Sequence, residues 1–196
     1  MGSPDERDAP PSLAARADRP LHAAFALASL AYPVVRYHVF GAVPWKDLPL
    51  FVFDKAVCLY AVLALVATAW FRARRAPERV SAWRRTLLAA TVLHVVLSLC
   101  LMGPAYFGKL YGADGRLTLA AGLGMLAGVM ALAAWWGGPI RRLVDRRRTL
   151  AVGALLVAVH VAGIGLGGWL DPATWPGAMP PITLISAIGA LAAVRR

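Results

Sequence analysis

The chain has 196 residues, of which 59% are hydrophobic and 16% are charged, and its mean hydropathy is +0.61. A soluble domain of this length needs more polar surface, so the composition indicates a membrane protein. The net charge is +11, but the arginines lie in short blocks between apolar runs. This is typical of membrane-flanking loops and argues against a nucleic-acid partner.

Residues 1–20, "MGSPDERDAPPSLAARADRP", are polar and rich in proline. We expect a disordered cytoplasmic tail here, because so polar a segment cannot bury enough apolar surface to fold. The apolar run that follows has no small-residue cleavage site leading into a soluble domain, unlike a signal peptide. Residues 21–196 are expected to form one transmembrane domain.

Six apolar runs predict an all-α bundle of six transmembrane helices. A bilayer core about 30 Å thick requires about 20 apolar residues per helix. The runs lie at about 22–40, 49–71, 84–103, 117–137, 149–170 and 181–194. Pro33 is expected to kink the first helix, whereas Pro181 suits the first turn of the last one.

The basic residues predict the orientation of this bundle. With six spans, 16 of the 21 lysines and arginines fall on one side of the membrane. Basic residues favour the cytoplasmic side, so both termini are expected there, in a multi-pass protein of the inner or plasma membrane.

The predicted outer loops differ in character from the arginine-rich inner ones. They are rich in glycine, proline and aromatic residues, and the aromatic residues are Trp45, Tyr106, Tyr111, Trp169 and Trp175. Such residues form an interfacial belt in many membrane proteins. A docking or substrate surface on the outer side is the other interpretation.

Two glycine pairs have the GxxxG spacing that allows close helix contact in lipid. They are Gly124 with Gly128, and Gly163 with Gly167. Tight bundling is the simpler interpretation, and close backbone approach beside a flat cofactor is the functional one.

Two histidines lie in the middle of apolar runs. His94 follows Arg85 by nine residues and His160 follows Arg148 by twelve. At the helical rise of 1.5 Å these spacings correspond to about 14 Å and about 18 Å, so both imidazoles are expected near the bilayer centre at similar depth. Two histidines at matching height on neighbouring helices can be the axial ligands of one haem iron.

The alternative is that these histidines are structural and bond to serine, threonine or backbone groups. Thr91 and Ser98 are the local candidates beside His94. His22 and His38, near the two ends of the first run, are expected to be interfacial rather than ligands.

Asp54 and Lys55 enter the second run near its outer end. Adjacent residues point apart on a helix, so these two need not pair with each other, and we expect them to bond to other helices or to line an outer polar cavity. A role in proton or quinone chemistry is the lesser alternative. The two cysteines, Cys58 and Cys100, provide neither a disulfide framework nor a CxxC metal site.

The segments "WRRTLLAATVLHVVLSL" and "RRLVDRRRTLAVGALLVAVHVAG" resemble the third and fifth helices of the ferric-reductase-like transmembrane domain. In that family a basic turn leads into a helix with a mid-membrane histidine on both spans. The resemblance covers roughly residues 30–194. It implies a six-helix bundle that binds haem b and passes electrons across the membrane, as in ferric reductases and superoxide-producing oxidases.

Many members of that family carry a second histidine on each of these helices, about thirteen or fourteen residues away, and so hold two haems. Here those positions are Phe107 and Gly108 after His94, and Arg147 before His160. The resemblance therefore implies one haem, with iron bound by His94 and His160. The cytoplasmic arginine blocks are expected to contact anionic lipid, with haem propionates as the alternative.

No GxGxxG motif follows a predicted strand, so flavin or NAD(P)H chemistry is expected from another protein, or electrons from quinol. We therefore predict the haem subunit of an oxidoreductase, with a separate electron donor (a flavoprotein or quinol) and an external redox partner or substrate. A non-haem membrane scaffold or assembly protein is the rival class. A small transporter is disfavoured, because no inverted repeat is evident.

Overall fold

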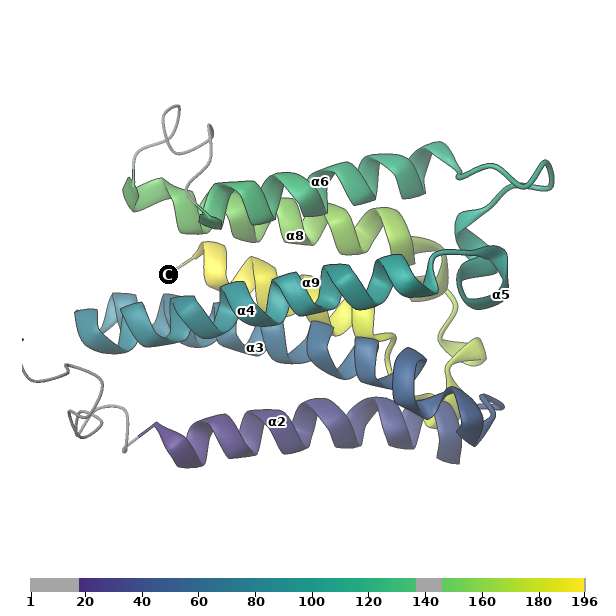
Figure 1. The fold of residues 1–196 in the computed structure, drawn as a ribbon, viewed down its shortest axis with the longest axis horizontal. Coiled ribbons are helices and arrows are strands. Elements are labelled where there is room, and N and C mark those ends of the chain that lie inside the picture. Colours follow the sequence, from purple (N-terminus) through teal and green to yellow (C-terminus); the bar gives the residue numbers. More distant parts are fainter. Residues whose placement is uncertain (1–17, 137–145, 196) are drawn as a thin grey trace, which may run out of the picture.

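Long helices run side by side through this protein (Figure 1). The structure is a computed structural model that describes residues 18–136 and 146–195. The long helices are α2 (Arg19–Val34), α3 (Phe53–Ala73), α4 (Pro77–Leu101), α6 (Leu119–Trp136), α8 (Arg146–Trp169) and α9 (Ile182–Val194). In the described part the only β pairing is an isolated bridge between Tyr111 and Leu117, so the fold is all-α, as predicted.

Five helices of the described chain are long and apolar enough to cross a membrane. They are Trp45–Ala73, Pro77–Leu101, Leu119–Trp136, Arg148–Trp169 and Pro176–Val194. Large apolar side chains on these helices are exposed, including Leu99 at 65%, Leu123 at 55% and Ile188 at 61%. An exposed apolar surface of this extent needs a non-aqueous environment, which a bilayer supplies.

The first predicted span, 22–40, is not among those five. Its α-helix ends at Val34 and continues as a single π turn, Val35–Val39. Pro33 has no backbone N–H, so the helix lacks one hydrogen bond there, and the π turn begins two residues later. This turn carries two buried polar residues, Arg36 and His38, toward the bundle.

The second difference concerns the third predicted span, 84–103. Its helix, α4, begins at Pro77, so part of the arginine block belongs to the helix and not to a loop. Proline suits the first helical turn, and Glu78 there interacts favourably with the helix dipole.

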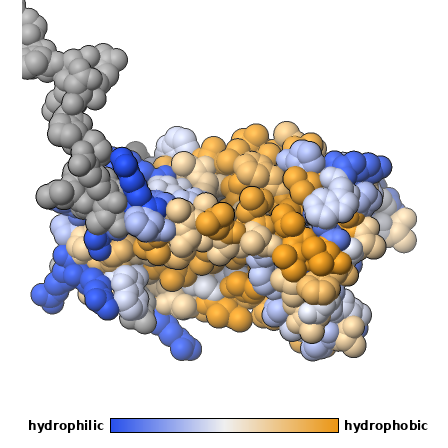
Figure 2. Space-filling view, turned by 90° about the horizontal axis from the view of Figure 1, so that it is seen from below, coloured by the Kyte–Doolittle hydropathy of each residue, from blue (hydrophilic) through white to orange (hydrophobic). Residues whose placement is uncertain are grey.

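The two ends of the bundle differ (Figures 1 and 2). At one end α2 begins, α3 meets α4, α8 begins and α9 ends; we call this the arginine end, after Arg72, Arg74, Arg75, Arg79 and Arg148. At the other end, the loop end, lie residues 40–52, 102–118 and 170–181, with the short helix α5 (Pro104–Phe107). The surface is apolar between these ends in the view of Figure 2, and its hydrophilic residues gather at the ends.

Helix α3 packs on α2, α4 and α9, and α8 packs between α6 and α9. The contacts are made by small side chains, mostly alanine, with larger ones such as Leu65 and Trp83 filling the space between them. Small residues let helices approach closely where lipid provides no hydrophobic driving force. Gly124 and Gly163 show this best, because a Cβ added to Gly124 would lie 3.3 Å from the Gly163 Cα.

Candidate functional site

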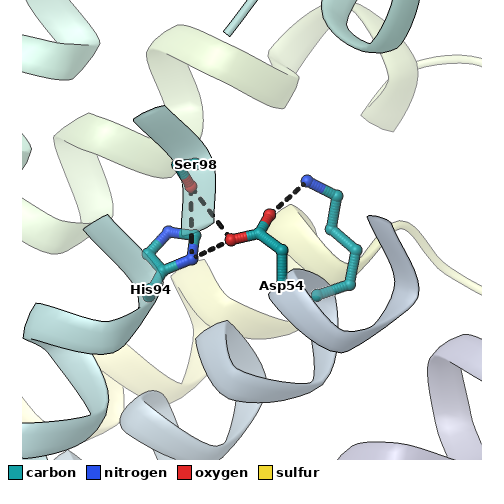
Figure 3. Close-up of polar contacts among 4 residues, drawn as sticks. Asp54, His94 and Ser98 are labelled. Carbon is teal, nitrogen blue, oxygen red and sulfur yellow. Dashed lines mark hydrogen bonds and ion pairs between the residues drawn. The ribbon is translucent and has the colours of Figure 1, made fainter. Parts of the chain in front are cut away.

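His94 on α4 is held by a buried carboxylate on α3. Asp54 lies in the first turn of α3 with no solvent exposure, and its Oδ1 is 2.8 Å from His94 Nδ1 (Figure 3). Ser98, one turn beyond His94, donates its hydroxyl to the same oxygen at 3.0 Å. The other oxygen, Oδ2, accepts from Lys55 Nζ at 3.0 Å. Three groups therefore satisfy the carboxylate inside the bundle.

The contacts of this cluster bear on two expectations from the sequence. Asp54 bonds to another helix, as expected, and it also pairs with its neighbour Lys55. The Cβ atoms of adjacent helical residues diverge, yet the four-carbon stem of lysine is long enough to fold back to its neighbour. Ser98 is a partner of His94, at 3.4 Å from Nδ1, whereas the Thr91 hydroxyl bonds to the Leu87 carbonyl instead.

His160 on α8 is held by a backbone group of α6. Its Nδ1 is 2.9 Å from the carbonyl oxygen of Gly124. Gly128 makes this approach possible, because a Cβ at that position would lie 2.8 Å from His160 Nδ1. The first predicted glycine pair therefore serves both to pack α6 on α8 and to make room for an imidazole. In the second pair only Gly163 is in close contact, since a Cβ on Gly167 would meet nothing within 4 Å.

The two imidazoles border the same space in the bundle. A mid-bundle cavity of about 160 Å³ and a loop-end cavity of about 490 Å³ are each lined by both histidines. The residues common to both cavities are Cys58, His94, Ser98, Met102, Met125, His160 and Val161. The structure thus brings together the two histidines that the sequence singled out.

The other two histidines lie apart from this space. His22 stacks on Trp83 with ring centroids 3.9 Å apart, and its Nδ1 is 2.8 Å from the Tyr60 hydroxyl. His38 stacks on Trp45 at 4.4 Å, with Nδ1 2.8 Å from the Val43 carbonyl oxygen. Neither lines the mid-bundle or the loop-end cavity.

The hydrogen bonds fix which nitrogen of each cavity histidine is available. A carboxylate or carbonyl oxygen only accepts, so Nδ1 of His94 and of His160 carries the proton and donates it. In the neutral form of each ring, Nε2 is then the acceptor nitrogen. A histidine that ligates a metal commonly donates its other N–H to a carboxylate or a backbone carbonyl in this way.

The arrangement does not have the geometry of a Ser-His-Asp nucleophile. In such a triad the serine and the aspartate bond to opposite nitrogens of the imidazole. Here Ser98 and Asp54 both face Nδ1 of His94, and the serine proton is directed to the carboxylate. Nor does a group of three His, Cys, Asp or Glu side chains with metal-binding geometry occur in residues 18–136 and 146–195.

Cys58 is the cavity residue that sequence reasoning did not connect with the histidines. It lies one turn after Asp54 on α3, it lines both cavities together with His94, and both cysteines are free. The spacing of Asp54 and Cys58 at i and i+4 places both on one helix face, which was the available signal. Which helix that face meets was not encoded in the spacing.

Comparison of the chain with known protein families, curated proteins and solved structures finds no match.

Proposed function

We propose that this chain is a membrane electron-transfer subunit that holds a single haem b between α4 and α8. His94 and His160 would be the axial ligands of the iron. The observation that carries the proposal is that both imidazoles line one pair of cavities, while the Nδ1 of each is occupied by an oxygen acceptor. On neutral rings, Nε2 of each histidine would then be the ligand for a metal that takes two ligands from the protein.

The lining of the cavities fits a ligand with a large apolar body. Around the histidines the mid-bundle cavity is bordered by aliphatic and thioether side chains, among them Leu65, Leu87, Val95, Met125 and Val129. These side chains are apolar, as the face of a haem macrocycle is. Gly128 adds space where any side chain would push against the His160 ring.

Each supporting residue has a definite task in this proposal. A bound haem would supply reversible one-electron chemistry at its iron. Asp54 orients the His94 ring and makes its Nε2 more basic, and the Gly124 carbonyl orients His160. Lys55 and Ser98 hold the Asp54 carboxylate in place. Electrons would come from a separate flavoprotein or from quinol and pass to an external redox partner.

We further propose six membrane spans, with both termini in the cytoplasm of a cell whose inner or plasma membrane holds the protein. The sixth span would be α2 with its π turn, which lies alongside α3. The beginning of α2 and the end of α9 lie at the same end of the bundle, as an even number of crossings requires (Figure 1). Arginines gather at that end, which favours the cytoplasmic side.

A non-haem scaffold is the second candidate, because every cavity histidine already has a hydrogen-bond partner in the bundle. Absorption spectroscopy of the purified full chain, produced with ample haem and measured oxidised and dithionite-reduced, separates the two. The haem proposal expects one haem per chain with the spectrum of six-coordinate, low-spin iron. A folded but colourless protein would reject it and leave the scaffold.

A further inference from the structure

A buried guanidinium without a counter-ion lies at the loop end of the bundle. Arg36 is 6% exposed, and it projects from the π turn that follows α2. Its Nη1 donates to the Met179 carbonyl, but its Nε has no partner. In the described residues no carboxylate pairs with Arg36, and its guanidinium carbon lies 5.7 Å from the centre of the Tyr37 ring. A buried cation without an anion is costly, so such a group suggests that a ligand supplies the anion.

Arg36 lines the loop-end cavity, and so do two other cations, Lys55 and Lys109. No acidic side chain lines that cavity among the described residues. The Lys55 ammonium lies 4.4 Å from the centre of the Phe107 ring and uses one of its donors on Asp54, so two donors remain. The cavity therefore presents positive charge and hydrogen-bond donors beside aromatic walls.

The same cavity reaches His94 and His160. A ligand that occupied it would have its apolar part at the histidines, near Met125 and Val161, and its acidic part at Arg36. Haem has two such parts, an apolar macrocycle and two propionate carboxylates on one edge.

We infer that Arg36, assisted by Lys55, is the carboxylate-binding site for the haem propionates, so that haem is bound with its acidic edge toward the loop end. This inference rests on the proposed function. It places the propionates away from the arginine blocks, which the sequence had offered as an alternative propionate site. The arginine fork forms charge-assisted hydrogen bonds to carboxylates, and these are stronger inside a low-dielectric bundle than in water.

The test compares haem with haem dimethyl ester, in which the two carboxylates are esterified and uncharged. Both are titrated into the full chain purified without haem, and affinity is read from the absorption change on binding. The wild-type chain is expected to bind haem at least about tenfold more tightly than the ester, which corresponds to one charge-assisted contact. This comparison needs no variant and so does not depend on how a substitution affects folding.

Arg36→Met is expected to lose most of the affinity for haem while leaving that for the ester unchanged, so that the preference disappears. Arg36→Lys is expected to retain part of the preference for haem over the ester. Lys46→Met is the matched control, because Lys46 is exposed at the same end of the bundle and does not line the cavity.

Three results would overturn the inference. Equal affinity of the wild-type chain for haem and ester would show that the carboxylates are not recognised. An equal loss of both ligands in Arg36→Met would show that Arg36 only supports the fold. If neither haem nor the ester bound, the proposed function would be rejected as well. If both bound with equal affinity and the binding depended on the histidines, only the propionate site would be rejected.

Discussion

His94 Nδ1 and Asp54 Oδ1 lie 2.8 Å apart, although 40 residues separate them in the sequence. The contact joins α4 to α3 in the interior, where Asp54 has no exposure to solvent. Together with the bond from His160 to the Gly124 carbonyl, it sets the ring orientation at the shared cavities.

The first prediction concerns the ligands. His94→Ala and His160→Ala are each expected to abolish the six-coordinate, low-spin spectrum, because the iron would lose one of two imidazoles. His22→Ala and His38→Ala are the controls, since both side chains lie outside the cavities, and they are expected to keep the spectrum. Haem content and spectrum of the four purified variants decide the matter. Loss of the spectrum in all four variants would contradict the assignment, and so would its retention in both His94→Ala and His160→Ala.

The second prediction concerns Asp54. In Asp54→Asn the Nδ1 proton of His94 faces a neutral acceptor, so the ligand becomes less electron-donating and the oxidised iron is stabilised less. The midpoint potential is expected to rise. Each tenfold by which the affinity for oxidised haem falls more than the affinity for reduced haem raises the potential by about 59 mV. Redox titration followed by absorption measures it. Asp114→Asn is the control, because Asp114 is exposed in the loop and bonds to Arg116. An unchanged potential in haem-loaded Asp54→Asn would refute the tuning role.

The third prediction concerns the glycines of α6. Gly128→Ala places a methyl group 2.8 Å from His160 Nδ1, so the imidazole must shift. Overpacking of this kind costs about 1–3 kcal/mol, and both haem affinity and the unfolding temperature are expected to fall. Gly122→Ala, on the same helix, is the matched control because its Cβ would meet nothing within 4 Å. Equal behaviour of the two variants would show that the ring is not confined by Gly128.

The fourth prediction concerns topology. In a chain without its native cysteines, a cysteine at Arg75 is expected to resist a membrane-impermeant reagent in intact cells, because the proposed topology places the arginine end in the cytoplasm. Cysteines at Lys46 and Lys109, at the loop end, are expected to react. Permeabilised cells provide the control, in which all three sites react. Labelling of the Arg75 site in intact cells would reverse the orientation.

The fifth prediction concerns the loop end as a docking surface for the external redox partner. Tyr106 and Trp175 line the loop-end cavity, and Tyr111 lies beside it in the same group of loops. Alanine at these three positions is expected to slow electron transfer to the acceptor without removing haem. Stopped-flow reoxidation of the reduced protein measures this, with Lys46→Ala as the control. An unchanged rate at normal haem content would exclude the surface.

The sequence by itself indicated where the long helices lie and which two histidines lie in the middle of apolar runs, because both depend on local properties. Apolar runs long enough to cross a bilayer predict helices, since every backbone group must be satisfied within its own segment. The structure moved their limits where proline acts, at Pro33, which is followed by a π turn, and at Pro77, which begins α4. Part of the predicted tail, residues 1–17, and part of the second arginine block lie outside the described residues.

The tertiary structure alone decided the partners of the buried polar groups. Nothing in the spacing of Asp54 and His94 shows that they meet, because the contact depends on how α3 and α4 are aligned along their axes. The same holds for His160 and Gly124, and for Arg36, whose burial depends on the π turn and on the segment that contains Met179. A helix face is fixed by a period of 3.6 residues within one segment, whereas the residue opposite that face is fixed by packing between segments.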